Sequence, residues 1–211
     1  MPGRVHVVDD YASFRTAIER RLTLAGYEVA TYPSAQQLLD SRPDENVPSC
    51  ILLDVRIPGL SGPELQKRLN ALGSTVPIVF LTGHADTPTT VRAIKAGAED
   101  FLTKPVESET LLGAIERAIA RHAITRGEQR RLEEMLALLA ALTVRERQVF
   151  GLVVRGRLNK QIAHELGTTE RTIKAHRQQV MEKAKVQSLA ELVSIAEKLG
   201  VLAQVANSDN G

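Results

Sequence analysis

Four short apolar runs in this sequence each end in a side chain that could do chemistry. In chain order these side chains are Asp9 with Asp10, Asp54, Thr82 and Lys104. If the runs are neighbouring parallel strands, their carboxyl ends meet at one edge of a sheet and bring the five side chains together. Three carboxylates, one hydroxyl and one ammonium would then form a site that binds a divalent cation and accepts a phosphoryl group.

The predicted nucleophile is Asp54, because it lies centrally among these groups. Three carboxylates repel one another unless a hard cation lies between them, and Mg²⁺ takes oxygen ligands while keeping several waters. A phosphoryl group brings about −1.5 to −2 charges, which the metal, Lys104 and Thr82 would stabilise. The alternative, that acids after strands are only turn residues, explains any one position but explains the five together poorly.

Strand-like runs alternate with helix-like segments in the first half of the chain. The strand-like runs cover residues 5–8, 28–32, 50–55, 78–81 and 101–103. The helix-like segments cover residues 12–25, 34–40, 62–72, 88–96 and 108 onward. The first, third and fourth runs are almost continuously apolar, which indicates burial on both faces. We therefore predict an α/β domain with a doubly wound, five-stranded parallel sheet.

Composition and charge set the class of protein. The 211 residues are 43% hydrophobic and 25% charged, which is typical of globular domains. No apolar stretch reaches the roughly 18–20 residues of a membrane span, and the start of the chain lacks a signal-peptide layout, so we expect a cytoplasmic protein without membrane contact. The one cysteine, Cys50, begins an apolar run and is interpreted as a core residue.

The charges are distributed unevenly. Residues 1–120 carry 12 basic and 15 acidic side chains, for a net charge of −3, whereas residues 143–203 carry 11 and 6, for a net charge of +5. A basic C-terminal module suggests a polyanionic partner.

Four helices are predicted in the basic part. A capping box formed by Thr143 and Glu146 opens the first helix, and Gly167 lies in the turn between the second and third. The helices cover residues 143–154, 159–166, 170–185 and 189–199. Two helices joined by a glycine-containing turn are typical of a helix-turn-helix. The third would bury Ile173, Val180 and Ala184, and its other face, with Arg171, Lys174, Ala175 and Gln178, could enter a major groove.

The segment between the two parts contains no strong helix breaker. We therefore expect the last helix of the first part to continue as a linker over residues 121–141. Its apolar stripe consists of Leu132, Met135, Leu136, Leu139 and Leu142. This stripe could pair with a second subunit or pack on the following domain, and the sequence leaves both interpretations open.

Particular motifs resemble the receiver domain of two-component response regulators. They are Val8-Asp9-Asp10, Asp54 with Ile57-Pro58-Gly59 and Ser61-Gly62, Thr82-Gly83-His84, and Lys104-Pro105. The resemblance spans residues 4 to about 120 and implies a flavodoxin-like fold. It implies that Asp54 is the phosphoacceptor and that Asp10 and Asp54 bind Mg²⁺ directly. Asp9 would bind the metal mainly through water, the backbone carbonyl of Arg56 would complete the ligands, and Mn²⁺ could replace Mg²⁺.

The same resemblance implies roles for residues on the later strands. Thr82 and Lys104 would hold the phosphoryl oxygens, and Phe101 corresponds to the aromatic switch position of the family. Lys104-Pro105 would be a cis peptide. Ile57 departs from the pattern, because many receivers have methionine there.

Motifs in the basic part are similar to the effector domain of the LuxR, NarL and FixJ regulators. These motifs are Leu142-Thr143-x-Arg145-Glu146, Gly156-x-x-Asn159-Lys160-x-Ile162-Ala163 and Thr172-x-Lys174-x-His176-Arg177. The stretch Gly83-His84-x-Asp86 further resembles the FixJ subgroup and styrene- or toluene-responsive regulators. By this resemblance, base edges would be contacted by Lys174, Ala175 and Gln178. DNA phosphates would be contacted by Asn159, Lys160, Thr169, Thr172 and Arg177.

Together these resemblances predict a response regulator rather than an enzyme. A receiver (1–120), a linker (121–141) and a DNA-binding domain (142–204) would precede a disordered tail (205–211). The implied partners are a sensor histidine kinase, double-stranded promoter DNA, RNA polymerase and, on phosphorylation, a second copy. Two alternatives remain: a DNA-binding protein that does not depend on phosphorylation, and an aspartyl-phosphate phosphatase. The phosphatase is disfavoured, because such enzymes have a second aspartate where this chain has Arg56.

Overall fold

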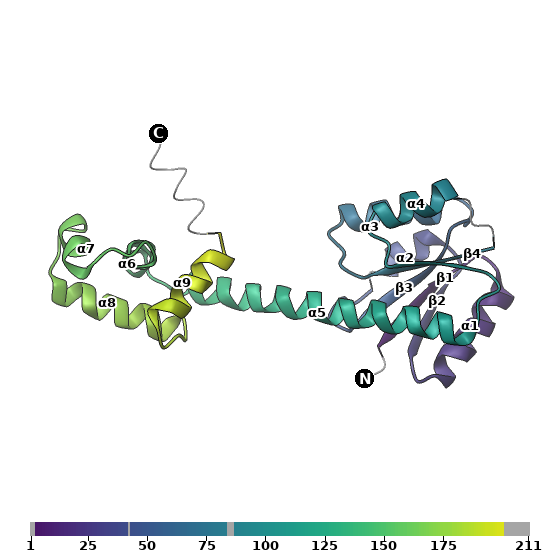
Figure 1. Cartoon of the computed structure of the whole chain (residues 1–211), viewed down its shortest axis with the longest axis horizontal. Helices are drawn as coiled ribbons and strands as arrows, with labels where there is room; N and C mark the ends of the chain where they lie inside the picture. Colours follow the sequence, from purple (N-terminus) through teal and green to yellow (C-terminus); the bar gives the residue numbers. More distant parts are fainter. Residues whose placement is uncertain (1–2, 42, 84–86, 201–211) are drawn as a thin grey trace. The chain divides into compact units, whose positions relative to one another are not determined.

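A computed structural model describes residues 3–41, 43–83 and 87–200 of the chain. The chain divides into two compact units with the boundary at Gly127, and each unit is described by itself (Figure 1). The tail predicted over 205–211, like residues 201–204, lies outside the described residues. No described helix is long and apolar enough to cross a membrane.

The first unit contains a five-stranded sheet in the order β2-β1-β3-β4-β5, with every neighbouring pair parallel. The strands are β1 (Arg4–Val8), β2 (Glu28–Tyr32), β3 (Ser49–Asp54), β4 (Ile78–Thr82) and β5 (Asp100–Thr103). The direction of winding reverses between β1 and β3, and ligand sites of such sheets lie outside the carboxyl ends at this point. The predicted α/β architecture is therefore confirmed.

Helices cover both faces of this sheet (Figure 1). They are α1 (Ala12–Leu24), α2 (Ala35–Ser41), α3 (Gly62–Ala71), α4 (Thr87–Lys95) and α5 (Ser108–Ala140). One core packs α1 and α5 against the sheet, and the other packs α2, α3 and α4 against the opposite face. The central strand β3 is buried along its whole length, as its continuous apolar run predicts. The predicted core residue Cys50 is fully buried in it.

The helix α5 is fixed to the amino-terminal end of the sheet through His122. This side chain is fully buried, and its Nδ1 accepts a hydrogen bond of 2.9 Å from the backbone N–H of Ser49. Burial lowers the pKa of His122, which favours the neutral ring that this acceptor role requires.

The second unit contains four further helices around one small core. They are α6 (Val144–Val154), α7 (Asn159–Glu165), α8 (Glu170–Lys183) and α9 (Leu189–Lys198). The predicted capping box is present: Glu146 N–H donates to Thr143 Oγ1, and Thr143 N–H donates to a carboxylate oxygen of Glu146. The predicted inward face of α8 is buried, with Ile173, Val180 and Ala184 in the core.

The apolar stripe of the linker is only partly covered. Leu142 is buried, and Leu139 packs against the core of the second unit. Leu132 and Leu136 remain 40% and 52% exposed. The carboxyl end of the stripe therefore packs on its own unit, while its amino-terminal part remains accessible.

The start of α3 is the tightest place next to the strand ends. A Cβ atom added at Gly62 would lie 2.4 Å from the backbone oxygen of Asp54 and 3.0 Å from the ring of Phe80. Because backbone oxygen and a buried ring cannot move away cheaply, we expect Gly62→Ala to destabilise the first unit by roughly 1–3 kcal/mol. Urea unfolding followed by circular dichroism measures this change.

Gly113→Ala is the matched control, because its added Cβ would meet only the flexible end of Arg117 at 3.5 Å within α5. Alanine in a helix interior is favoured over glycine by about 0.5–1 kcal/mol, so this variant should be at least as stable as the parent chain. Equal stability of the two variants would contradict the steric argument.

Candidate functional site

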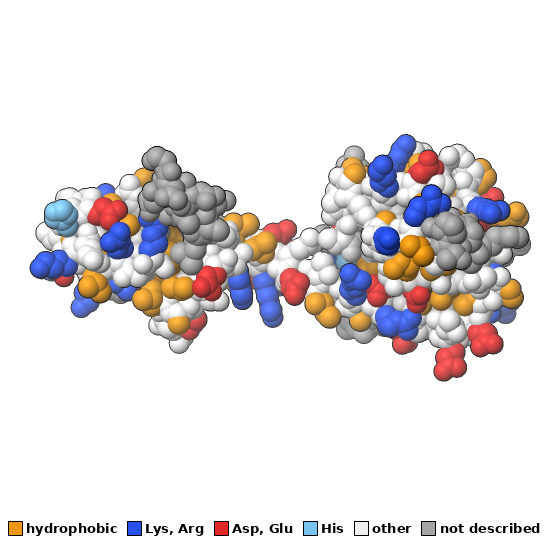
Figure 2. Space-filling view, turned by 45° about the horizontal axis from the view of Figure 1, so that its top comes forward, with side chains coloured by type: hydrophobic (Ala, Val, Ile, Leu, Met, Phe, Trp, Pro, Cys, Tyr) orange, Lys and Arg blue, Asp and Glu red, His pale blue; other side chains and the backbone are white. Residues whose placement is uncertain are grey.

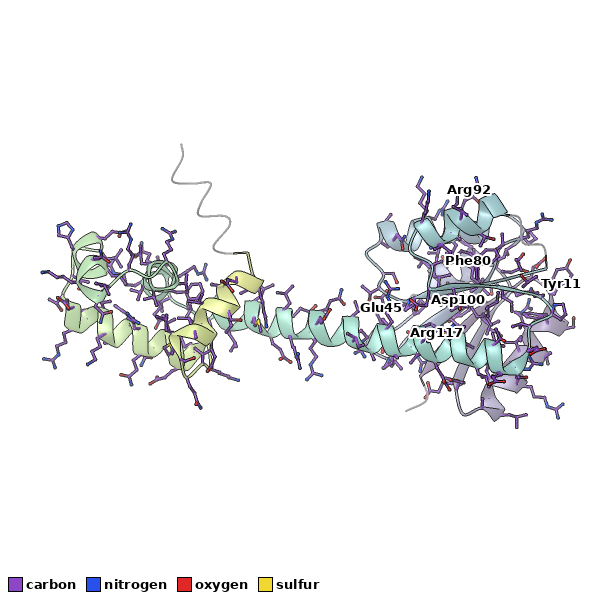
Figure 3. All side chains as sticks on the ribbon, viewed as in Figure 1. Tyr11, Glu45, Phe80, Arg92, Asp100 and Arg117 are labelled. Carbon is purple, nitrogen blue, oxygen red and sulfur yellow. The ribbon has the colours of Figure 1, made fainter. Side chains whose placement is uncertain are left out.

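The carboxyl ends of β1 and β3 bring three carboxylates together. One carboxylate oxygen from each of Asp9, Asp10 and Asp54 lies within 4.8 Å of the others. Asp10 and Asp54 border a pocket of about 590 Å³ that is also lined by Tyr11 and Thr82. Figure 3 shows Tyr11 at this edge of the first unit and Glu45 at the opposite edge. The predicted juxtaposition of the acids therefore exists in the structure.

Lys104 forms ion pairs with two of these acids. Its Nζ lies 2.5 Å from Asp9 Oδ2 and 2.8 Å from Asp54 Oδ2. Burial raises the pKa of Asp9, while the hydrogen bond from Lys104 opposes this rise. Burial alone would lower the pKa of Lys104, but its hydrogen bonds to Asp54 and Asp9 outweigh that effect and raise it. The ammonium therefore stays charged and partly neutralises the cluster.

The third acid, Asp10, keeps an oxygen available. Among the described residues, Asp10 Oδ1 is a buried oxygen with no hydrogen-bond partner. An unpaired buried carboxylate oxygen is costly, and a hard cation supplies the missing partner. Because three carboxylates exceed the single positive charge of Lys104, the donor set fits a divalent cation such as Mg²⁺.

The other predicted pocket residues lie around this cluster. Thr82 is buried at the end of β4, and Arg56 lines the pocket while its backbone N–H donates to Asp54 Oδ1 at 3.2 Å. Phe101 is half-buried on β5, with its ring centroid 5.9 Å from that of Phe80. The Lys104-Pro105 peptide is cis, as the resemblance implies.

Sequence reasoning missed the first turn of α1 as part of this site. The ring of Phe14 lies against Lys104, with Nζ 4.0 Å from the ring centroid. Arg15 Nη1 donates to the backbone oxygen of Asp9 at 2.6 Å, and Tyr11 N–H donates to Asp9 Oδ1 at 2.8 Å. The available signal was an aromatic residue placed one helical turn after the acidic pair.

The second unit presents an exposed polar surface on α8. Arg171, Lys174, Ala175 and Gln178 are all exposed, as the predicted outer face requires. Lys and Arg side chains are spread over the visible face of this unit in Figure 2. A basic helix surface of this kind fits the major groove of DNA.

Four of the five residues predicted to contact phosphates already take part in hydrogen bonds. Asn159 and Arg177 bind each other through a hydrogen bond of 2.8 Å, which links the start of α7 to α8. Thr169 caps α8 by accepting from the N–H of Thr172. Lys160 is exposed and, within the described part of the chain, forms no ion pair. Its ammonium is thus available to a phosphate.

Ion pairing and capping hold α6 and α8 together. Lys183 Nζ lies 2.7 Å from Glu146 Oε2, and its hydrogen bond lowers the pKa of Glu146 to about 2. The same carboxylate caps α6 through Thr143. This pair keeps the surface of α8 in a fixed orientation relative to α6.

A doubly wound sheet with an acid cluster and a lysine at its carboxyl edge, followed by a helix-turn-helix unit, defines a class of protein. It is the class that combines a phosphoryl-accepting domain with a DNA-binding domain.

Comparisons with known proteins identify the family. Residues 5–116 match the response regulator receiver domain, and residues 140–196 match the bacterial regulatory proteins of the luxR family. Nodulation protein W of Bradyrhizobium diazoefficiens is 44% identical over 94% of this chain and 87% of its own length. The transcriptional regulatory protein FixJ of the same organism is 40% identical over 95% and 97%. The structure of the response regulator StyR is 46% identical, covers 92% of this chain and 98% of its own, and gives a TM-score of 0.83.

The chain therefore belongs to the two-component response regulators with a LuxR-type DNA-binding domain. The predicted resemblance and fold class are confirmed. This is a family of transcription regulators rather than enzymes. The alternative of an aspartyl-phosphate phosphatase is therefore rejected. Receiver domains bind Mg²⁺ at an acidic pocket, and this chain supplies one in Asp9, Asp10 and Asp54.

We expect Asp10→Asn to weaken Mg²⁺ binding by about tenfold or more, because it removes the charge of the unpaired oxygen. Without Mg²⁺ the variant should melt at a higher temperature than the parent chain, because one of three repelling carboxylates is neutral. The chain contains no tryptophan, so titration calorimetry and melting curves against MgCl₂ are the suitable measurements.

Asp44→Asn is the control, because Asp44 is exposed and lies outside the cluster. Unchanged Mg²⁺ affinity of Asp10→Asn would rule out Asp10 as a ligand.

Proposed function

We propose that Asp54 accepts a phosphoryl group from a sensor histidine kinase and that the phosphorylated chain binds promoter DNA as a homodimer. The observation that carries the proposal is Lys104, whose ammonium bridges Asp54 and Asp9 beside the unpaired oxygen of Asp10. This arrangement offers a nucleophile, a cation for the phosphoryl oxygens and a metal ligand within one pocket.

The transfer itself needs few protein groups. A carboxylate oxygen of Asp54 attacks the phosphorus of the donor's phosphohistidine, the phosphorus–nitrogen bond breaks, and the donor imidazole leaves with the electron pair. Asp10, Asp54 and the carbonyl of Arg56 would hold Mg²⁺ directly, and Asp9 would hold it through water. When bound, Mg²⁺ or Mn²⁺ supplies positive charge that offsets the crowded oxygens. Lys104 binds a phosphoryl oxygen.

Thr82 and Phe101 form the switch in this proposal. The hydroxyl of Thr82 moves to bind a second phosphoryl oxygen. The ring of Phe101 then moves inward. The half-buried state of Phe101 supports this role, because an inward shift of the ring would bury more of its apolar surface. Phosphorylation shifts the equilibrium only by as much as it stabilises one state over the other. This movement changes the surfaces of α4 and α5.

Each segment of the chain has its own function in this proposal. Residues 1–120 act as the receiver, 121–141 as the linker, and 142–204 as the DNA-binding domain, with RNA polymerase as the further partner at the promoter. Base edges are contacted by Lys174, Ala175 and Gln178. Phosphates are contacted by Asn159, Lys160, Thr169, Thr172 and Arg177. The exposed amino-terminal part of the linker stripe supports contact between two copies on phosphorylation.

Binding of selected DNA by the full-length chain tests this proposal. A duplex is selected from a random-sequence pool with protein treated with acetyl phosphate and Mg²⁺. Affinity and mass in solution are then measured for the parent chain and for Asp54→Asn, with and without the phosphodonor. We expect the phosphodonor to raise affinity and the dimer fraction at least tenfold in the parent chain only. Asp44→Asn should behave as the parent chain does.

The opposite outcomes are equally clear. Equal binding in every condition would replace the switch with DNA binding that does not depend on phosphorylation. Retention of covalent phosphate by Asp54→Asn would exclude Asp54 as the acceptor.

Two lysines should separate base contacts from phosphate contacts. We expect Lys174→Ala to cost roughly 1–3 kcal/mol on the selected duplex and little on other sequences. Lys160→Ala should weaken binding to all duplexes and reduce the slope of log K against log salt by about 1. Competition assays over a series of salt concentrations measure both effects. Lys198→Ala, which changes an exposed cation on α9, is the control. Identical behaviour of Lys160→Ala and Lys174→Ala would contradict the assignment.

A further inference from the structure

The ammonium of Lys104 has three partners of two kinds. Two N–H groups point at carboxylates, with 2.5 Å to Asp9 Oδ2 and 2.8 Å to Asp54 Oδ2. The ring of Phe14 provides the third contact, with its centroid 4.0 Å from Nζ. A cation within about 6 Å of an aromatic centroid is attracted by the negative face of the ring. The ring therefore attracts the ammonium from a third direction.

We propose that Phe14 is a positioning residue for phosphorylation, which holds the Lys104 ammonium in place while this lysine exchanges Asp54 for a phosphoryl oxygen. The inference rests on the proposed function, because it assumes that Asp54 becomes phosphorylated.

The ring is fixed relative to the acid cluster. Phe14 is half-buried in the first turn of α1 and packs against the core formed with α5. That first turn is tied to the end of β1, because Arg15 donates to the backbone oxygen of Asp9 and Tyr11 N–H donates to its carboxylate. Asp9 and Phe14 thus form a binding position for the ammonium that is fixed relative to the sheet.

Asp54 is the partner that must change. Once one of its oxygens is bonded to phosphorus, its carboxylate loses its charge, and the phosphoryl oxygens become the stronger acceptors. Lys104 then has to turn toward them without leaving the site. A ring face attracts the ammonium without a fixed acceptor atom, so Nζ can turn over Phe14 while it stays paired with Asp9.

The ring also covers one side of the lysine's ammonium. A pocket of about 180 Å³ beside α1 is lined in part by Phe14, Lys104 and Arg21. If a smaller, non-aromatic side chain replaced Phe14, more of the ammonium would be open to solvent in this pocket. Water would then compete with the phosphoryl oxygen and weaken the electrostatic contact.

Two substitutions at Phe14 separate positioning from packing. Phe14→Leu keeps an apolar side chain in the core but removes the aromatic face, whereas Phe14→Tyr keeps the face. Tyr27→Leu is the matched control, because Tyr27 packs against the same core without contacting Lys104. All variants are full-length and are first compared by melting temperature, so that a general loss of packing is recognised.

The measurements are the affinity for beryllofluoride in the presence of Mg²⁺, by calorimetry, and the rate of phosphorylation by acetyl phosphate. We expect Phe14→Leu to lose about 3- to 10-fold in both, which is the range of a partly buried cation–π contact. Phe14→Tyr should stay within about twofold of the parent chain. Tyr27→Leu should match the parent chain in both measurements, whatever its melting temperature.

Chains that carry Lys104→Ala test whether the effect of Phe14→Leu depends on the lysine. In chains that carry Lys104→Ala, Phe14→Leu should cause no further loss of beryllofluoride affinity, because the ring has no ammonium to hold. An equal loss in both backgrounds, or an equal loss for leucine and tyrosine, would show a packing role and overturn the inference. So would unchanged binding and phosphorylation of Phe14→Leu. If the parent chain itself takes up neither beryllofluoride nor phosphate, the proposed function fails instead.

Discussion

The repulsion between three carboxylates at one edge of the sheet is the constraint on which the first unit depends. Asp9 and Asp54 are almost fully buried, and Asp10 has a buried oxygen without a partner among the described residues. Burial alone raises the pKa of Asp9 and so favours its neutral form, while the hydrogen bond from Lys104 favours the charged form. One ammonium cannot neutralise three acids, and the cluster therefore retains the affinity for further positive charge that its chemistry requires.

The topology of the sheet places these opposing charges. β1 and β3 are neighbours, so the acids that follow them meet at the position where the winding reverses. Lys104 comes from beyond the edge strand β5 and reaches across β4, and its backbone N–H donates to the carbonyl of Thr82. A lysine side chain is long enough to cover this distance, which a short polar residue is not, and its compact ammonium carries three rotatable donors, unlike the planar fork of arginine. Strand order and side-chain length therefore act together.

Part of this site could be predicted from the sequence, and part could not. Asp9, Asp10, Asp54 and Lys104 follow apolar runs, and parallel strands bring such positions to one edge whatever the details of packing. Which acid pairs with Lys104, and which oxygen stays unpaired, depends on side-chain rotamers set by the whole core. The contact with Phe14 was missed for the same reason. In the second unit, the period of α8 predicted its buried face, but the pairing of Asn159 with Arg177 depends on how α7 meets α8.

The rigidity of each part decides where a phosphoryl signal can act. Phe80 is fully buried between the sheet and its helices, and Gly62 leaves no space beside it. Phe101 packs on Phe80 but is only half-buried, so the close-packed core restricts its ring less than that of Phe80. A close-packed core transmits a small displacement only through an element that has two possible positions. In the proposed mechanism the half-buried ring of Phe101 is this element, because β5 pairs with β4, the strand that ends in Thr82.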